Sequence, residues 1–177
     1  MGSAAGTRGW RRACWHAAAA VLGTVLQASP AAAQPQGAPR FQDYPAPRLT
    51  GPAVPPILTR GDLLYRTRLR EAAREPANFA GSHVLAVWGC GAGCVMGAAV
   101  SLRTGRVTWL PGTVCCWGVG VADDFNPVAF RADSALVILS GARNEKEGDV
   151  GTHYYRLQGG RFVHLRSTPG LGGAAPP

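Results

Sequence analysis

The sequence predicts an α+β protein that is mainly β, with one N-terminal helix packed on an antiparallel meander of six or seven strands. Only one segment, residues 59–76, combines a helical period with helix boundaries. From residue 83 onward, short apolar and β-branched runs alternate with turn residues. The connections between these runs are too short for crossover helices, so neighbouring strands are expected to be antiparallel.

The helix is predicted from its boundaries as well as from its periodicity. Thr59 and Asp62 form a capping-box pattern at its start, and Pro76 marks its end. Four residues share one apolar face at helical spacing: Tyr65, Leu69, Ala72 and Ala73.

The strands are predicted from runs of apolar residues bounded by turn signals. Gly159 and Gly160 form a two-residue hairpin signal between the last two of them. The segment 113–121 is ambiguous between strand and loop because of its glycines. The predicted strands are 83–89, 94–102, 106–110, 127–131, 135–140, 152–158 and 161–166.

The amino-terminal residues 1–33 have the order of a cleavable export signal. Arginines at 8, 11 and 12 precede the apolar stretch 14–28, and three alanines end at Ala33. The apolar stretch is shorter than the ~20 residues that span a bilayer. We therefore expect cleavage after Ala33, a periplasmic or secreted protein, and no integral membrane anchor after cleavage. An uncleaved anchor is the alternative.

The rest of the chain divides into three parts. Residues 34–56 are rich in proline and predict an extended, disordered leader without packed structure. Residues 57–166 predict a single β-rich domain, and residues 167–177 a disordered Gly/Ala/Pro tail. A core of this size is modest, so covalent cross-links would help to stabilise it.

Three segments of the predicted domain resemble a known family. They are "NFAGSHVLAVWGCGAGCVMGAAVSLRTGRVTWLP" (78–111), "FRADSALVILSG" (130–141) and "HYYRL…GGRFVHL" (153–165). Together they are similar to small secreted or periplasmic bacterial proteins that carry an F-A-G segment leading into W-G-C-G-x-x-C. The resemblance implies secretion and this fold, and it implies no reaction. The hairpins also resemble β-propeller blades, but the core holds too few for a closed propeller.

Cys90 and Cys94 flank a Gly-Ala-Gly loop between two predicted strands. Paired residues on such strands have Cα atoms about 4.5–5.5 Å apart, inside the disulfide window of about 4.4–6.8 Å. In an oxidising compartment we expect this pair to form a disulfide. Cys115 and Cys116 are adjacent, and three outcomes stay open for them: a strained or reduced pair, cross-bridges to Cys90 and Cys94, or free thiols.

Metal and redox chemistry are the main alternatives for these cysteines. No pair has the C-x₂-C spacing of zinc sites, and adjacent ligands suit a tetrahedral site poorly. A Cu(I) site formed by Cys90, Cys94 and Met96 is conceivable because soft metals select thiolates and thioethers. We expect no metal and no cofactor, and the cysteine setting differs from a C-x-x-C at a helix start.

Catalytic motifs of the common classes are absent from the sequence, including G-x-S-x-G, the P-loop and H-E-x-x-H. Asp123 or Asp124 together with His153 would suit acid–base chemistry only if the fold gathered them in a cleft. We therefore assign no catalytic residue and expect a protein that is not an enzyme.

The aromatic residues near the cysteines are candidate ligand contacts. They are Trp88, Trp109 and Trp117, with Tyr154 and Tyr155 further along the chain. They either form a binding platform or supply the core of a small β domain.

The leading functional hypothesis is an exported, non-catalytic binding or structural domain stabilised by a disulfide. After removal of 3 arginines with the signal, 15 of the 18 basic residues remain against 10 acidic ones, a net charge of +5. Outside the cytoplasm nucleic acid is a poor partner, so we expect an envelope component or protein, bound at the hairpin end with Trp88, Cys90, Cys94 and Trp117. The alternative is a thiol-redox or soft-metal (Cu/Zn) protein that uses Cys90, Cys94, Cys115 and Cys116.

Overall fold

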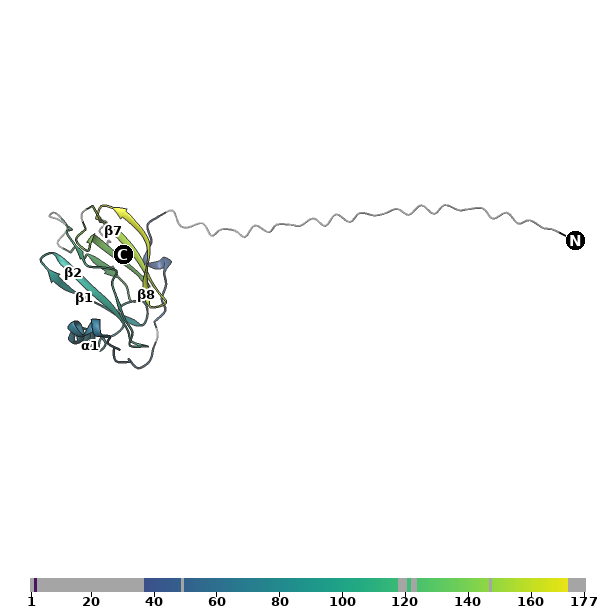
Figure 1. Cartoon of the computed structure of the whole chain (residues 1–177), viewed down its shortest axis with the longest axis horizontal. Helices are drawn as coiled ribbons and strands as arrows, with labels where there is room; N and C mark the ends of the chain where they lie inside the picture. The colour runs from purple at the N-terminus through teal and green to yellow at the C-terminus, as the bar shows by residue number, and fades with distance from the viewer. Residues whose placement is uncertain are drawn as a thin grey trace. The chain divides into compact units, whose positions relative to one another are not determined.

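The computed structural model describes Gly2 and residues 37–48, 50–117, 121, 124–146 and 148–171. The chain divides into two units, residues 1–34 and 35–177. Apart from Gly2, the predicted export signal lies outside the described residues, as does Asp123. The fold below is that of the second unit, whose described residues are coloured in Figure 1.

The described residues of the second unit form eight strands and three short helical segments. All paired strands are antiparallel, which confirms the predicted mainly β, α+β class. The count exceeds the prediction of six or seven strands because the ambiguous segment contains a two-residue strand. The strands are β1 (His83–Gly91), β2 (Cys94–Ser101), β3 (Val107–Trp109), β4 (Val114–Cys115), β5 (Val128–Phe130), β6 (Leu136–Arg143), β7 (Val150–Gln158) and β8 (Arg161–Pro169).

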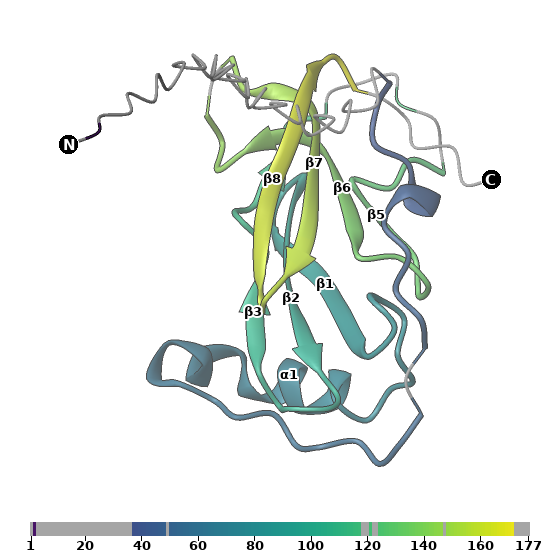
Figure 2. The same cartoon turned by 90° about the vertical axis from the view of Figure 1, so that its right-hand side faces the viewer.

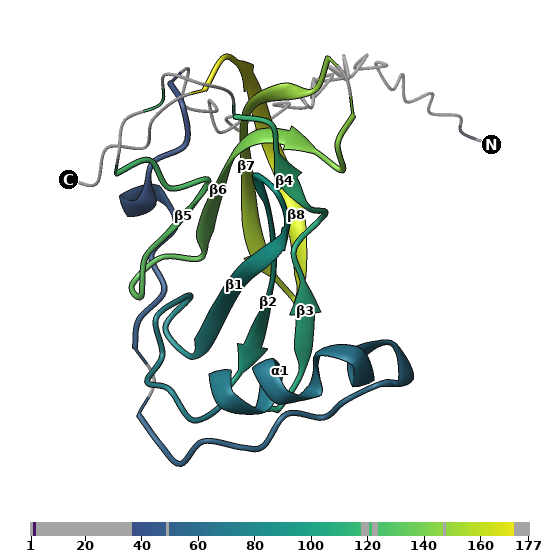
Figure 3. The ribbon, with the colours of Figure 1, turned by 90° about the vertical axis from the view of Figure 1, so that its left-hand side faces the viewer.

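The sheet is not a simple meander, because each of the two long strands β2 and β6 pairs with two short strands at different points along its length. β3 pairs with the second half of β2, and β4 pairs with its first two residues, Cys94 and Val95. β4 also pairs with Ala142 and Arg143 at the end of β6, whose first half pairs with β5. The two-residue strand β4 thus joins the β1–β2 hairpin to the β6–β7–β8 meander. Figure 2 shows the hairpin and the meander from one side, and Figure 3 shows them from the other side with β4 labelled.

The main core lies between these two halves of the sheet. Leu85 and Ala99 from the hairpin pack in one cluster with Leu139, Tyr155 and other residues of the meander. Successive side chains along a strand point to opposite faces, so the residues next to these core residues lie on the outer faces of the sheet. Each outer face is then covered by a segment that precedes the sheet in the sequence.

The helical segment covers the outer face of the β1–β2 hairpin. It begins as a 3₁₀ helix, η2 (Arg60–Tyr65), and continues as α1 (Arg66–Ala72), which lies beside the hairpin in Figure 1. The Asp62 carboxylate accepts hydrogen bonds from the Thr59 amide (2.7 Å) and hydroxyl (2.6 Å), so the predicted start of the helix is confirmed. The helix ends at Ala72, before the predicted residue 76. Among the described residues, no helix has the length and apolar character to cross a membrane.

Residues 37–48 and 50–56 differ from the prediction of an unpacked leader, because they contact the sheet at several points although most of them are exposed. A short 3₁₀ helix, η1 (Phe41–Asp43), places Phe41 and Tyr44 on the outer face of β6 and β7. The buried Ser134 hydroxyl donates to the Phe41 carbonyl (2.8 Å), and the Val54 amide donates to the Leu102 carbonyl (2.8 Å). Proline favours extended backbone, which suits a segment that runs along a sheet and bonds to it at intervals.

The carboxyl-terminal end also differs, since β8 continues past residue 166. His153 pairs with Ser167, and Gly151 pairs with Pro169, so residues 167–169 belong to the sheet and not to a tail.

Candidate functional site

The two disulfides lie at the turn end of the β1–β2 hairpin. Cys90 and Cys94 are bonded, with their Cα atoms 5.2 Å apart across the hairpin. Cys115 and Cys116 are bonded to each other as adjacent residues, with Cα atoms 3.8 Å apart. The alternatives of cross-bridges and free thiols are therefore not what the structure contains.

The four cysteines are arranged around one point of contact between strands. Cys94 in β2 is the register partner of Cys115 in β4, and the two pack together with Ala142. Both are buried, whereas Cys90 and Cys116 are exposed. Cys116 has a φ of +61°, a left-handed backbone conformation that non-glycine residues rarely adopt. Each disulfide therefore joins one exposed and one buried cysteine.

Two of the candidate aromatic residues form part of the packing between helix and sheet. The rings of Trp88 and Trp109 lie 5.7 Å apart, and Tyr65 lies 5.5 and 5.0 Å from them. Trp88 is only 8% exposed. The indole nitrogen of Trp109 donates to the Asp62 carboxylate (2.8 Å). These two residues hold the helix on the hairpin.

The other candidate aromatic residues lie elsewhere. Tyr155 belongs to the main core and Tyr154 to the cluster on the outer face of the meander, as adjacent residues on a strand must. Trp117 packs on Phe125, with ring centroids 5.9 Å apart. The structure therefore does not gather the five aromatic residues into one platform.

A pocket lies at the end of the β1–β2 hairpin that is opposite to the disulfides. It has a volume of about 900 Å³ and is bounded by residues 57–62, the β2–β3 turn and the β7–β8 turn. Ser82, His83 and Ser101 line it near the paired ends of β1 and β2, and Arg103 and Arg106 extend from the turn. We call this the basic pocket.

Among the described residues, the two arginines of the basic pocket form no ion pair with a carboxylate. The ion pairs among the described residues involve Arg40, Arg131 and Arg143, and not Arg103 or Arg106. Both side chains are exposed at the pocket rim. The Arg106 guanidinium also lies against the backbone of Gly160, where a Cβ atom would come within 2.6 Å of it.

The ionisable residues within the pocket leave it with a net positive charge, because the ionised Asp62 carboxylate offsets only one of the two arginines. Burial alone would raise the pKa of Asp62, but the hydrogen bonds from Thr59 and Trp109 outweigh it and hold the pKa below its ordinary value. Burial lowers the pKa of His83, and the charge of Arg103 lowers it to a smaller extent. A hydrogen bond from the imidazole to Ala80 acts in the opposite direction but does not outweigh burial. The carboxylate is thus fully engaged within the protein, and the imidazole is neutral at pH 7.

The basic pocket was not predicted from the sequence. Arg103 and Arg106 flank the Thr104–Gly105 pair, where the predicted strand 94–102 ends and 106–110 begins. A turn with an arginine on each side was the one local signal. Gly160 lies more than fifty residues further along the chain than Arg106. Only the pairing of strands in the sheet brings it to the same pocket.

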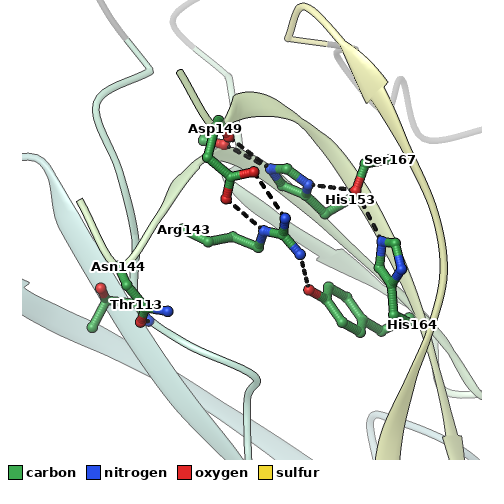
Figure 4. Close-up of polar contacts among 9 residues, drawn as sticks. Thr113, Arg143, Asn144, Asp149, His153, His164 and Ser167 are labelled. Carbon is green, nitrogen blue, oxygen red and sulfur yellow. Dashed lines mark hydrogen bonds and ion pairs between the residues drawn. The ribbon is translucent and has the colours of Figure 1, made fainter. Parts of the chain in front are cut away.

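A second polar cluster connects β6, β7 and β8 (Figure 4). Arg143 forms a two-pronged ion pair with Asp149, at 2.8 Å for both contacts, and donates to the Tyr155 hydroxyl. These contacts hold the pKa of Asp149 below its ordinary value, the hydrogen bond with Arg143 being the main cause. The cluster fixes the β6–β7 connection on the end of the main core.

Two histidines of this cluster are linked through one hydroxyl group. His153 Nε2 lies 3.1 Å from the carbonyl oxygens of Gly141 and Asp149, so it carries the proton, and Nδ1 accepts from Ser167 Oγ (2.8 Å). His164 Nε2 then donates to the same oxygen (2.9 Å). A β-bulge in this pair of strands brings His164 and Ser167 to one face.

The acid–base group that the sequence left as a possibility is not assembled from the described residues. Asp124 is exposed on the loop before β5, and His153 is 2% exposed and engaged by Ser167 and two carbonyl groups. No three His, Cys, Asp or Glu side chains in the described part of the chain are placed to hold a metal ion.

Comparison with known proteins yields no match to any family model, curated protein or solved structure. The resemblance drawn from the F-A-G and W-G-C-G-x-x-C segments therefore stays a prediction.

Proposed function

We propose that this protein is an exported, non-catalytic binding domain whose basic pocket takes an anionic group of an envelope component or protein. The observation that carries the proposal is the pair of exposed arginines, Arg103 and Arg106, at the rim of a pocket of about 900 Å³ without a free carboxylate. Guanidinium groups bind phosphate, sulfate and carboxylate through paired hydrogen bonds.

The lining of the pocket favours a ligand that carries both an anion and an apolar part. Ser82 and Ser101 supply hydroxyl groups, and neutral His83 supplies a hydrogen-bonding ring nitrogen. Ile57 is 67% exposed at the same pocket and would cover an apolar portion of the ligand. A pocket already formed by packed segments loses little freedom on binding.

The basic pocket is a better site than the hairpin end suggested by the sequence. That hypothesis relied on Trp88 as a ligand contact, but its ring is engaged with Tyr65 and Trp109 beneath the helix. The disulfide-bonded end offers Trp117 from the earlier candidates, whereas the pocket combines charge, hydroxyl groups and volume.

Export is proposed on the pattern of residues 1–33 and on the cysteine chemistry. Disulfides persist in oxidising compartments such as the periplasm and the extracellular space. Two disulfides in one small domain are consistent with such a compartment.

The experiment is a titration of the protein with three anionic probes: a heparin oligosaccharide, polyphosphate and polyaspartate. We expect binding of at least one probe that weakens as salt is added. Arg103→Gln and Arg106→Gln should each weaken it about tenfold, since hydrogen bonds between charged groups contribute about 1.5–3 kcal/mol.

The matched control is Arg70→Gln, which removes the same charge from the exposed face of α1. This variant should retain the affinity of the unmodified protein. Equal weakening in all three variants would mean that net charge and not the pocket holds the probe, and absence of binding to every probe would refute the proposal.

A further inference from the structure

We propose that the two disulfides form a relay, in which reduction of Cys115–Cys116 is passed to Cys90–Cys94 through the two buried cysteines. The proposal is independent of the basic pocket, which lies at the other end of the hairpin. Its basis is the juxtaposition of Cys94 and Cys115 as partners on adjacent antiparallel strands.

Register alone places the buried pair at disulfide distance. Residues directly opposite on antiparallel strands have Cα atoms about 4.5–5.5 Å apart, within the usual window of about 4.4–6.8 Å for a disulfide. Opposite residues also project to the same face of the sheet. Cys94 and Cys115 therefore occupy the positions of a cross-strand disulfide while each is bonded to another cysteine.

The exposed cysteines determine where an external thiol enters. Cys116 is exposed and directly bonded to buried Cys115. Its left-handed backbone, with φ +61°, is a conformation that costs free energy for a side-chain-bearing residue, and opening the vicinal ring allows it to relax. Attack is therefore expected at Cys116 in preference to Cys90.

The relay consists of three exchange steps with a dithiol of the C-x-x-C oxidoreductase class as reductant. A thiolate of the dithiol attacks Cys116 Sγ, the bond to Cys115 breaks, and Cys115 leaves as a thiolate. The Cys115 thiolate attacks Cys94 Sγ, which forms the Cys94–Cys115 bond and releases Cys90 as a thiolate that takes up a proton.

The third step closes the balance of electrons. The second thiol of the reductant attacks its own sulfur in the mixed disulfide, so that Cys116 leaves as a thiolate and is protonated. The reductant is oxidised to its disulfide, and the protein gains two electrons and two protons. The product has one buried disulfide, Cys94–Cys115, and two exposed thiols, at Cys90 and Cys116.

Trypsin distinguishes this product from simple reduction of one disulfide. Cleavage at arginine places Cys90 and Cys94 on the peptide 75–103 and the other pair on 107–131, while Cys14 lies on a separate peptide. The full chain is treated with one equivalent of dithiothreitol, alkylated and digested without further reduction. We expect 75–103 covalently joined to 107–131, with alkyl groups on Cys90 and Cys116.

Two single variants test the same step without any reductant. In Cys116→Ser the remaining Cys115 thiol faces Cys94, so the joined peptides with alkylated Cys90 should be a major species. In the matched control Cys115→Ser the remaining thiol is exposed Cys116, and the joined peptides should be lost. The relay is wrong if Cys116→Ser retains Cys90–Cys94 with alkylated Cys115, or if partial reduction alkylates Cys115 and Cys116 while the peptides stay separate.

Discussion

Asp62 is expected to be the most consequential single carboxylate for the stability of the described domain. Its side chain is 4% exposed and accepts hydrogen bonds from the Thr59 amide and hydroxyl and from the Trp109 indole. Asp62→Ala removes a helix cap, which costs about 1 kcal/mol, and leaves the indole N–H without its acceptor, which costs about 1–2 kcal/mol more. We therefore expect a loss of about 2–3 kcal/mol in the free energy of unfolding.

The measurement is urea denaturation followed by tryptophan fluorescence, with the slope m unchanged because the same surface is exposed on unfolding. Asp133→Ala is the control, since Asp133 is exposed and its carboxylate bonds to the nearby Arg131 side chain. It should leave the denaturation midpoint unchanged. The reasoning is refuted if Asp62→Ala is as stable as this control.

A double-mutant cycle isolates the bond between helix and sheet. If Asp62 and Trp109 interact directly, the losses for Asp62→Ala and Trp109→Phe will add to more than the loss for the double variant. The pH dependence gives a second check. Because the pKa of Asp62 is lowered on folding, its contribution is present above the unfolded pKa of about 3.9 and is lost as the pH falls through the folded pKa. The difference between the unmodified protein and Asp62→Ala should therefore narrow in acid.

Two further predictions concern the packing of the amino-terminal segment and the histidine of the basic pocket. Gly81→Ala should destabilise the fold by about 3 kcal/mol, because Gly81 has φ +71° and its Cβ would lie 2.2 Å from the Pro47 carbonyl oxygen. Gly93→Ala, with φ +60° and open space around it, should cost only about 1 kcal/mol in thermal or urea denaturation, and equal losses would contradict the role of the contact. The lowered pKa of His83 means that the unfolded chain binds more protons below about pH 6.5, so stability should fall as the pH decreases through that value. His83→Gln should flatten this decline in denaturation at several pH values, and an unchanged slope would show that other groups cause it.

Features that depend on nearby residues could be predicted from the sequence. The capping box of Thr59 and Asp62 and the β1–β2 hairpin with its Cys90–Cys94 disulfide each lie within a few residues. The start of the helix was predicted correctly. The α-helix itself ends at Ala72, earlier than predicted, and turn hydrogen bonds from the Arg74 and Glu75 amides continue the chain to Pro76. The two-residue strand β4 had no signal of its own, since it exists only between β2 and β6.

The candidate sites were much less predictable than the strands. The aromatic residues were identified by type, but alternation along β7 separates Tyr154 from Tyr155, and the helix covers Trp88. The proline-rich segment was predicted not to pack because its sequence lacks a period. Its contacts arise from single residues, such as Phe41 and Tyr44, that meet the outer face of another segment.

By itself the sequence determined the fold class, the hairpins and the helix cap of this protein, because turn chemistry, alternation and capping act over two to five residues. The tertiary structure decided which distant residues meet: Arg106 with Gly160 at the basic pocket, and Cys94 with Cys115 between the disulfides. The physical reason is strand register. A slip of one residue turns every side chain of a strand to the other face, and register between strands far apart in the chain is set by burial in the common core.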